Sequence, residues 1–277
     1  MDAILSVKDL KKIYGKGCDD CLGTNPPFSE DNKCPTCGSI IACTDICFDV
    51  YPGEVLGIVG ESGSGKSTVL GCINLTLSAT SGEIYYIPLD PGQNILHVNA
   101  QVRRQLQNIH FGIVYQNPHL GLNFNISGEG NAAERLLVAG NKHFGNIQDK
   151  VHRLFKRVEL PESRYKDFPK QYSGGMQQRV QIAKALVSEP SLILLDEPTG
   201  GLDVSVQARI LDLIRSIARE LKVAMIMVSH DMQVIRLLCE RIIVMKHGRV
   251  IETGLTDRVI EDPRESYTQT LVHSTLQ

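Results

Sequence analysis

The sequence feature that most constrains the fold is the glycine-rich octet at residues 60–67, GESGSGKS. It matches the phosphate-loop pattern G-x-x-x-x-G-K-[ST] at every fixed position. The apolar run Glu54–Val59 before it is typical of a buried strand, and Thr68–Ile73 after it has the pattern of a helix start. The glycines allow a tight bend that points successive N–H groups and the helix N-terminus at a phosphate chain. The octet therefore predicts a strand, a phosphate-binding loop and a helix.

Two neighbouring residues of this loop are predicted to have different roles. Lys66 is expected to reach the β- and γ-phosphates of a nucleotide, and the Ser67 hydroxyl to hold Mg²⁺. A glycine-rich turn that binds nothing is the alternative, and the flanking strand and helix argue against it. The predicted nucleotide contacts in this segment are Gly60, Ser62, Gly63, Gly65, Lys66, Ser67 and Thr68.

Composition sets the class of protein. With 277 residues the chain is long enough for a large single domain, or for one domain that carries insertions. A net charge of −2 gives no reason to expect nucleic acid as a partner. No apolar run approaches the roughly 18 residues of a membrane span, and the N-terminus lacks a signal-peptide core. We therefore predict a cytoplasmic protein, which can still reach a membrane through a partner.

Six of the eight cysteines lie between Cys18 and Cys47. In a reducing cytosol such a cluster indicates metal binding rather than disulfides. Two C-x-x-C turns supply four thiolates for one tetrahedral ion, and structural zinc is the expected metal. Iron in the same thiolate cage and a metal-free, reduced loop are the alternatives. The predicted ligands are Cys18, Cys21, Cys34 and Cys37.

The segment between the two C-x-x-C turns has almost no apolar residues, so it needs a cross-link such as a bound metal ion to stabilise its fold. Its turn-forming residues are Asn25, Pro26, Pro27, Ser29, Asp31 and Asn32. Cys43 and Cys47 are left out of the metal set because Cys47 falls in an alternating strand pattern. Cys72 and Cys239 stand in apolar segments and are expected to be small core residues.

An acidic pair follows the apolar run Ser191–Leu195, which is predicted to be a strand. Asp196 and Glu197 are the two carboxylates that Mg²⁺ and water need beside a phosphate loop. Asp196 is predicted to hold the metal through its water shell. Glu197 is predicted to orient or deprotonate the attacking water.

Other candidate residues stand at the ends of predicted elements. Ser173 is expected to cap a helix that runs to about Val187, and Asp203 to cap one that runs to about Leu221. His230 follows the buried strand Val223–Val228, at a position where it is predicted to contact the γ-phosphate of the nucleotide. Tyr14, which follows the expected opening strand Ile4–Leu10, either stacks on an adenine or is an ordinary strand-end tyrosine.

The order of the elements predicts domain boundaries. Residues 1–254 are expected to form an α/β nucleotide-binding domain, which contains the cysteine-rich insert at 17–44. The pattern changes to helical segments, such as Asn131–Ala139 and Ile147–Val158, within a subdomain at 117–172. Residues 255–277 are expected to form a helical tail without motif chemistry.

These motifs occur in an order that resembles the ATP-binding cassette (ABC) ATPases along nearly the whole chain. The matching pieces are Tyr14, the phosphate loop, Gln116, Ser173-Gly174-Gly175, Asp196-Glu197, Asp203 and His230. The resemblance implies a phosphate-loop NTPase fold with an antiparallel β subdomain and an inserted helical subdomain.

The resemblance also implies Mg²⁺-dependent ATP hydrolysis in a head-to-tail dimer with a second ABC subunit, an identical copy or a paralogue. Ser173, Gly174 and Gly175 would then serve ATP bound mainly to the partner. Magnesium would be held by Ser67, Gln116 and Asp196. The catalytic residues would be Glu197, His230, Lys66 and Gln116, with Tyr14 and Asp203 among those that bind the nucleotide.

Within that family the sequence is similar to the ATP-binding subunits of carbon–phosphorus lyase systems for phosphonates. The stretches that carry the similarity are 52–66, 140–147, 173–179, 200–209, 254–259 and 267–269. Gly200-Gly201 replaces the Ser-Ala usual in other cassettes and is expected in this subfamily. The cysteine insert departs from the subfamily's pattern.

The resemblance leaves three functions open. The first is an ATPase that docks on the carbon–phosphorus lyase core subunits. The second is the energising subunit of an oligopeptide-type importer, with a membrane permease as its partner. The third is a metal-sensing regulatory module.

Overall fold

The computed structural model describes residues 2–23 and 32–276. It divides into two compact units, Met1–Val98 with Ile226–Gln277, and Asn99–Met225. The sequence motifs are distributed over both units. Each unit is built around its own strands.

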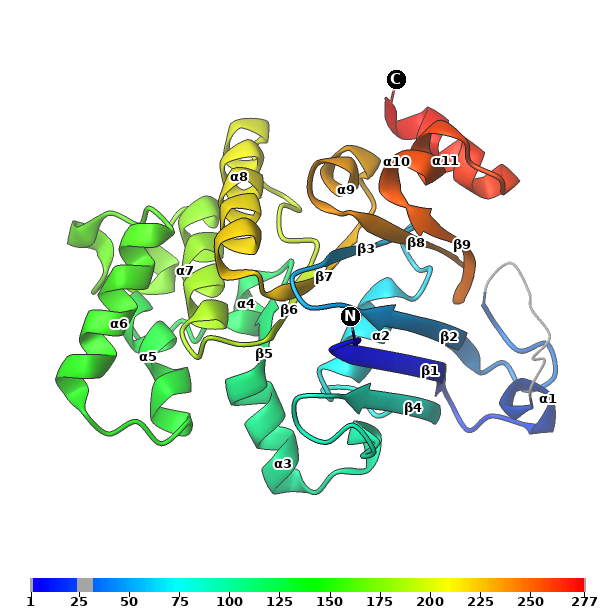
Figure 1. Ribbon diagram of the computed structural model, residues 1–277, viewed down its shortest axis with the longest axis horizontal. Coiled ribbons are helices and arrows are strands. Elements are labelled where there is room, and N and C mark those ends of the chain that lie inside the picture. The colour runs from blue at the N-terminus through cyan, green and yellow to red at the C-terminus, as the bar shows by residue number, and fades with distance from the viewer. Residues whose placement is uncertain (1, 24–31, 277) are drawn as a thin grey trace. The chain divides into compact units, whose positions relative to one another are not determined.

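In the first unit, an antiparallel sheet has the strand order β2-β1-β4 (Figure 1). Its central strand β1 runs from Leu5 to Tyr14, past the expected strand end at Leu10. Register shifts between Val7 and Tyr14 locally interrupt its pairing with β2. The strands are β1 (Leu5–Tyr14), β2 (Ile40–Val50) and β4 (Ser81–Tyr86).

The same unit contains a second set of strands in the order β7-β3-β8-β9. Every residue of β3 and β7 is buried, as expected for strands covered on both faces. The predicted terminal hairpin forms between the antiparallel strands β8 and β9. The elements are β3 (Val55–Val59), α2 (Lys66–Ile73), β7 (Ala224–Ser229), α9 (Met232–Leu238), β8 (Arg241–Lys246) and β9 (Arg249–Leu255).

The tail after the hairpin folds as two helices, α10 (Thr256–Glu261) and α11 (Ser266–Leu276), drawn in red in Figure 1. They are attached by apolar side chains, since Tyr267, Leu271 and Val272 are buried. Within residues 2–23 and 32–276, no helix combines the length and the apolar character needed to cross a membrane.

The second unit pairs strands β5 and β6 in parallel and is otherwise mainly helical. The helices expected from Asn131–Ala139 and Ile147–Val158 form with shifted ends, as α5 and α6. Ser127 caps α5, its hydroxyl accepting a hydrogen bond from the Gly130 N–H at 3.1 Å. The elements are α3 (Ala100–Gln105), a π-helical turn (Leu106–His110), β5 (Phe111–Val114), α4 (Pro118–Gly121), α5 (Gly128–Val138), α6 (Phe144–Arg157), α7 (Gly174–Leu186), β6 (Leu192–Asp196) and α8 (Val204–Leu221).

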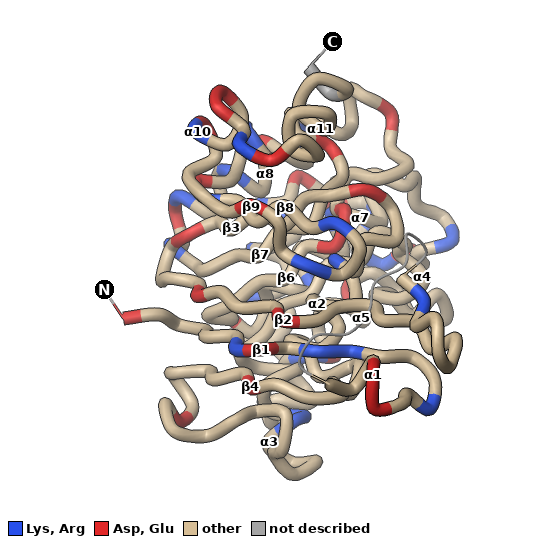
Figure 2. The backbone as a smooth tube through the Cα atoms, turned by 90° about the vertical axis from the view of Figure 1, so that its right-hand side faces the viewer, with Lys and Arg blue, Asp and Glu red and all other residues tan. Residues whose placement is uncertain are grey.

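The cysteine-rich insert leaves β1 and returns to β2 in the first unit. The described part of the insert contains the short helix α1 (Asp19–Leu22), whose acidic first turn follows the basic end of β1 (Figure 2). Strand β2 begins at Ile40, so the last residues of the insert expected at 17–44 belong to the strand. The turn formers Asn25, Pro26, Pro27, Ser29 and Asp31 lie outside the described residues.

Candidate functional site

The phosphate loop joins β3 to α2 and is held by close backbone contacts. A Cβ at Gly65 would lie 2.1 Å from the carbonyl oxygen of Ala42 in β2. A Cβ at Gly60 would lie 2.1 Å from the carbonyl oxygen of Met245 in β8. Since Gly65 also has a left-handed φ of +97°, only glycine fits there without displacement of its surroundings. The loop is thus fixed against two strands.

Lys66 opens α2 and turns its side chain back into the loop. Its Nζ donates hydrogen bonds to the carbonyl oxygens of Gly60 and Glu61, each at 2.7 Å, and the side chain is buried. A buried ammonium held by carbonyls is ready to exchange those acceptors for phosphate oxygens. Ser67, beside it, is exposed, and Thr68 is half-buried. Their contacts with nucleotide and magnesium stay predictions.

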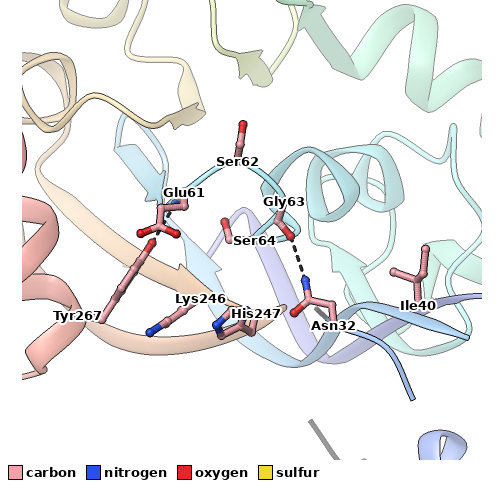
Figure 3. Close-up of a pocket in the computed structure, with 9 residues that line it drawn as sticks. All are labelled: Asn32, Ile40, Glu61, Ser62, Gly63, Ser64, Lys246, His247 and Tyr267. Carbon is pink, nitrogen blue, oxygen red and sulfur yellow. Dashed lines mark hydrogen bonds between the residues drawn. The ribbon is translucent and has the colours of Figure 1, made fainter. Parts of the chain in front are cut away.

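A cavity of about 420 Å³ lies along the outer side of this loop (Figure 3). Tyr267 from α11 accepts a hydrogen bond at its hydroxyl from the Glu61 N–H at 2.9 Å. Lys246 lies over the Tyr267 ring, with Nζ 4.7 Å from the ring centroid. The lining residues are Asn32, Ile40, Glu61, Ser62, Gly63, Ser64, Lys246, His247 and Tyr267.

Several of these lining residues escaped the sequence analysis. Asn32 was interpreted only as a turn former, yet its Nδ2 donates to the carbonyl oxygen of Gly63 at 3.0 Å. Tyr267 belongs to the tail, in which no motif chemistry was expected. Neither residue belongs to a short motif, so no local signal could have identified it.

Two predicted nucleotide contacts stand at strand ends in the same unit. Tyr14 is the last residue of β1, pairs with Ile40, and is 40% exposed. Lys12 Nζ lies 5.0 Å from the centroid of its ring. His230 follows β7 and is exposed. Stacking of Tyr14 on adenine and contact of His230 with a γ-phosphate stay predictions.

In the second unit, Gln116 and Glu197 are brought together. Gln116 Nε2 donates to Glu197 Oε2 at 2.9 Å, although 81 residues separate them in the chain. Glu197 has a φ of +46°, a sparsely populated region for a residue other than glycine. Asp196, beside it, ends β6.

The same region explains one unusual feature of the sequence. A Cβ at Gly200 would lie 2.9 Å from Gln116 Nε2 and 3.1 Å from Gln116 Cγ. Any larger residue would therefore press on the glutamine that hydrogen-bonds to Glu197. Gly200, where other cassettes are expected to carry serine, leaves room for this arrangement.

The Ser173-Gly174-Gly175 segment opens α7, also in the second unit. Ser173 caps the helix as predicted, its Oγ accepting from the Met176 N–H at 3.4 Å. Ser173 and Gly174 are exposed, whereas a Cβ at Gly175 would lie 2.6 Å from Val206 Cγ1 on α8. Glycine at 175 thus permits close packing of α7 on α8.

The predicted cap at Asp203 is wrong in one respect. Asp203 occupies the N-cap position of α8, but its side chain makes no capping hydrogen bond. At the helix start, the Asp203 carbonyl accepts hydrogen bonds from the N–H groups of Val206 and Gln207, each at 2.9 Å. A role for Asp203 in nucleotide binding stays a prediction.

The four predicted metal ligands form one cluster. Their sulfur atoms all lie within 4.8 Å of one another. The Cys18–Cys21, Cys18–Cys34 and Cys21–Cys37 sulfur pairs are 3.8, 3.6 and 3.7 Å apart. Four sulfurs about 2.3 Å from one zinc ion in tetrahedral geometry lie about 3.8 Å apart, so the cluster fits a single ion.

The surroundings of the cluster act differently on its thiols, because burial raises the pKa of Cys21 while hydrogen bonds lower that of Cys37. Cys21 and Cys34 are buried and pack with Ile13 of β1 and Ile41 of β2. Hydrogen bonds from the side chain and backbone of Ser39 lower the pKa of Cys37 to about 6, which favours its thiolate at neutral pH.

The remaining cysteines stand apart from this cluster. Cys43 is buried within β2, and burial raises its pKa to about 12. Cys47, also in β2, is exposed and hydrogen-bonds to Asp9. Among the described residues, neither belongs to the group that could hold a metal ion. Cys72 and Cys239 are buried, as expected for core residues.

Comparison with known proteins gives consistent matches. A family model described as ABC transporter matches residues 43–200. The phosphonates utilization ATP-binding protein PhnK of Escherichia coli is 50% identical over 234 residues, covering 84% of this chain and 91% of that protein. The E. coli oligopeptide transport ATP-binding protein OppD is 34% identical over 275 residues, covering 99% of this chain and 76% of that protein.

Solved structures agree with the sequence matches. The dimeric structure of the bacterial ABC transporter cassette MJ0796 has a TM-score of 0.75 and 28% identity, covering 91% of this chain and 98% of that one. The same scores describe its post-hydrolysis dimer bound to ADP and Pi. These matches confirm the fold class predicted from the sequence.

The backbone contacts of the loop predict an order of stability for two variants. Gly65→Ala should lower the free energy of unfolding more than Gly63→Ala does, by roughly 1–3 kcal/mol. Both glycines have left-handed φ angles, but among the described residues only the Gly65 methyl would meet a carbonyl oxygen, and no described atom lies within 4 Å of a Cβ at Gly63. Urea denaturation of both variants and the wild type measures the difference. Equal losses would contradict the steric account.

Proposed function

The chain belongs to the ABC family of ATPases, and we propose that it is the ATP-hydrolysing subunit of a carbon–phosphorus lyase system for phosphonates. The observation that carries this proposal is the 50% identity to PhnK over most of both chains. The peptide-transport relatives OppD and DppF of E. coli are 34% and 33% identical. The Gly200-Gly201 doublet supports the same assignment.

The proposed ATP site uses the phosphate loop of the first unit. Lys66 would exchange the carbonyls of Gly60 and Glu61 for phosphate oxygens, and the loop N–H groups would bind the same phosphates. Tyr14 would stack on the adenine, which its exposed ring supports. Magnesium, which neutralises phosphate charge when bound, would be held by Ser67, Gln116 and Asp196.

The proposed hydrolytic group is Glu197, with His230 near the γ-phosphate. Gln116 would orient the Glu197 carboxylate through its hydrogen bond, and a carboxylate held in this way would accept a hydrogen bond from water. Glycine at 200 leaves space for that orientation. These residues would position the attacking water molecule and accept its proton.

A head-to-tail dimer is part of the proposal. The N-terminus of α7 has an exposed Ser173 and Gly174, and helix N-termini bind phosphate oxygens. A second ABC subunit, identical or paralogous, would place its ATP against this end. The dimeric structure of the related cassette MJ0796 supports this arrangement.

The cysteine cluster is proposed to hold one structural zinc ion. Its sulfur spacing fits one tetrahedral ion, and its packing against β1 and β2 suits a staple for an insert with few apolar residues. Reduced thiolates agree with the cytoplasmic location that we propose. Iron in the same cage remains the alternative to be tested.

Replacement of the proposed catalytic carboxylate should stop turnover but not binding. Glu197→Gln keeps an oxygen that accepts the Gln116 hydrogen bond but lacks a carboxylate, so steady-state ATP hydrolysis should fall at least about 100-fold. Size-exclusion chromatography with light scattering should show an ATP-dependent dimer. Glu162→Gln, at an exposed carboxylate of the same unit, is the matched control and should keep wild-type turnover. Wild-type turnover in Glu197→Gln would remove Glu197 from the mechanism.

The identity of the partner protein distinguishes the proposed role in a lyase system from a role in import. The tagged chain, purified from detergent-solubilised cells grown on a phosphonate as phosphorus source, should recover soluble lyase core subunits. Recovery of a polytopic permease would instead establish an importer. Recovery of the chain alone would favour a regulatory module built on the metal site.

Elemental analysis tests the metal site. The purified protein should contain about one zinc per chain, and the Cys34→Ser and Cys37→Ser double variant should contain much less. Cys43→Ser is the control and should keep its zinc, because Cys43 lies outside the cluster. Iron in place of zinc would correct the identity of the ion. No metal, with all thiols reactive, would contradict the site.

A further inference from the structure

The cysteine insert is attached directly to the phosphate loop. The carboxamide of Asn32 donates from Nδ2 to the carbonyl oxygen of Gly63 at 3.0 Å, across 31 residues of sequence (Figure 3). Gly63 is at the middle of the loop that is proposed to bind phosphates. A side chain of the insert therefore bonds to the backbone of the nucleotide site.

Asn32 belongs to the same short hairpin as two of the metal ligands. Its carbonyl oxygen accepts from the Ile41 N–H at 2.7 Å, and Lys33 bridges to Ile40. The turn of this hairpin is closed by the Cys34 N–H, which donates to the Ser39 carbonyl at 2.8 Å. Cys34 and Cys37 lie in that turn, so Asn32 is only two residues from a proposed ligand.

The hairpin is held by its pairing with the start of β2 and by the packing of Cys34 against Ile13 and Ile41. Its partner across the cluster is α1, which has four residues, far fewer than a helix needs to be stable alone. An ion at the cluster would join the turn carrying Cys34 and Cys37 to Cys18 and Cys21. Metal binding would thus order the segment that presents Asn32 to the loop.

The conformation of Asn32 is that of a constrained position. Its φ is +56°, in the left-handed region that asparagine tolerates better than most residues. Its Oδ1 is buried and makes no hydrogen bond among the described residues. Within the described part of the chain, the carboxamide is therefore oriented by its hydrogen bond to Gly63.

We propose that Asn32 is a positioning residue through which metal binding at the four-cysteine site strengthens ATP binding at the phosphate loop. The proposal rests on the proposed ATP site and zinc site. The hydrogen bond restrains Gly63 in the geometry seen here, so less ordering remains for ATP to impose. The coupling is reciprocal, and ATP should strengthen metal binding by the same factor.

The tail offers a matched control. Tyr267 also bonds to the loop backbone, through its hydroxyl and the Glu61 N–H at 2.9 Å, but it comes from α11 and not from the insert. Removing this second bond should weaken the loop without changing its response to metal. Loss of loop support in general can thereby be separated from loss of the link to the cysteines.

The experiment measures the dissociation constant of Mg-ATP for the full chain, metal-loaded and after treatment with a zinc chelator. Wild-type protein should bind ATP about fivefold more weakly without metal, the net effect of about one hydrogen bond. Asn32→Gly keeps the left-handed backbone accessible and should be about fivefold weaker with metal, with less than a twofold further change on chelation. Tyr267→Phe should keep the full fivefold response.

Asn32→Asp is a control for the added backbone flexibility of the Asn32→Gly variant. It keeps the shape of the side chain but places an acceptor oxygen where Nδ2 donated, so it too should lose the response to metal. Metal content is measured for every variant and should match the wild type before chelation.

Two results would overturn the coupling. The first is an equal change in ATP affinity on chelation in the wild type and both Asn32 variants. The second is a wild-type ATP affinity that does not change on chelation. Failure of the underlying proposals is distinguishable. A chain that binds metal but no ATP contradicts the ATP site, and one that binds ATP but no metal contradicts the zinc site.

Discussion

The close approach of backbones at the phosphate loop is the constraint on which the rest of the first unit depends. Carbonyl oxygens of Ala42 and Met245 occupy the space where side chains at Gly65 and Gly60 would begin. The loop is therefore shaped by β2 on one side and β8 on the other. Lys66 completes it, because its ammonium is buried and donates hydrogen bonds to the loop carbonyls, which phosphate oxygens would replace in the proposed complex.

The residues proposed for catalysis are arranged in a similar way in the second unit, where backbone geometry places polar side chains. Glu197 adopts a left-handed φ at the end of β6, and Gln116 reaches it from the end of β5. The room for this contact comes from the absence of a side chain at Gly200. Strain at one residue and a missing Cβ at another thus orient a carboxylate that the proposed reaction requires.

The cysteine insert enters this scheme between β1 and β2, at a place where added chain costs little in loop closure. The same place makes it influential, because β2 supplies the Ala42 carbonyl that contacts Gly65 and Ile40 pairs with Tyr14. The hairpin that carries Cys34 and Cys37 lies next to both the proposed adenine platform and the phosphate loop. An insertion at a more distant loop would have had no comparable contact with the nucleotide site.

The sequence by itself determined what short-range chemistry dictates. The glycine-rich octet, the two C-x-x-C turns and the buried runs before Gly60 and Asp196 each encode their structure within a few neighbouring residues. Local pattern was less reliable where more than one solution exists. Asp203 stands at a helix start yet makes no side-chain cap, and β2 begins at Ile40, inside the insert expected at 17–44.

Only the tertiary structure decided which distant groups meet. Asn32 reaches Gly63 across 31 residues, and Tyr267 reaches Glu61 across 206. Such bonds depend on strand register and on the placement of a whole hairpin or helix, and a hydrogen bond leaves no pattern in the sequence on either side. The sequence thus identified the groups that can bind phosphate and metal, while packing determined that the two sites are connected.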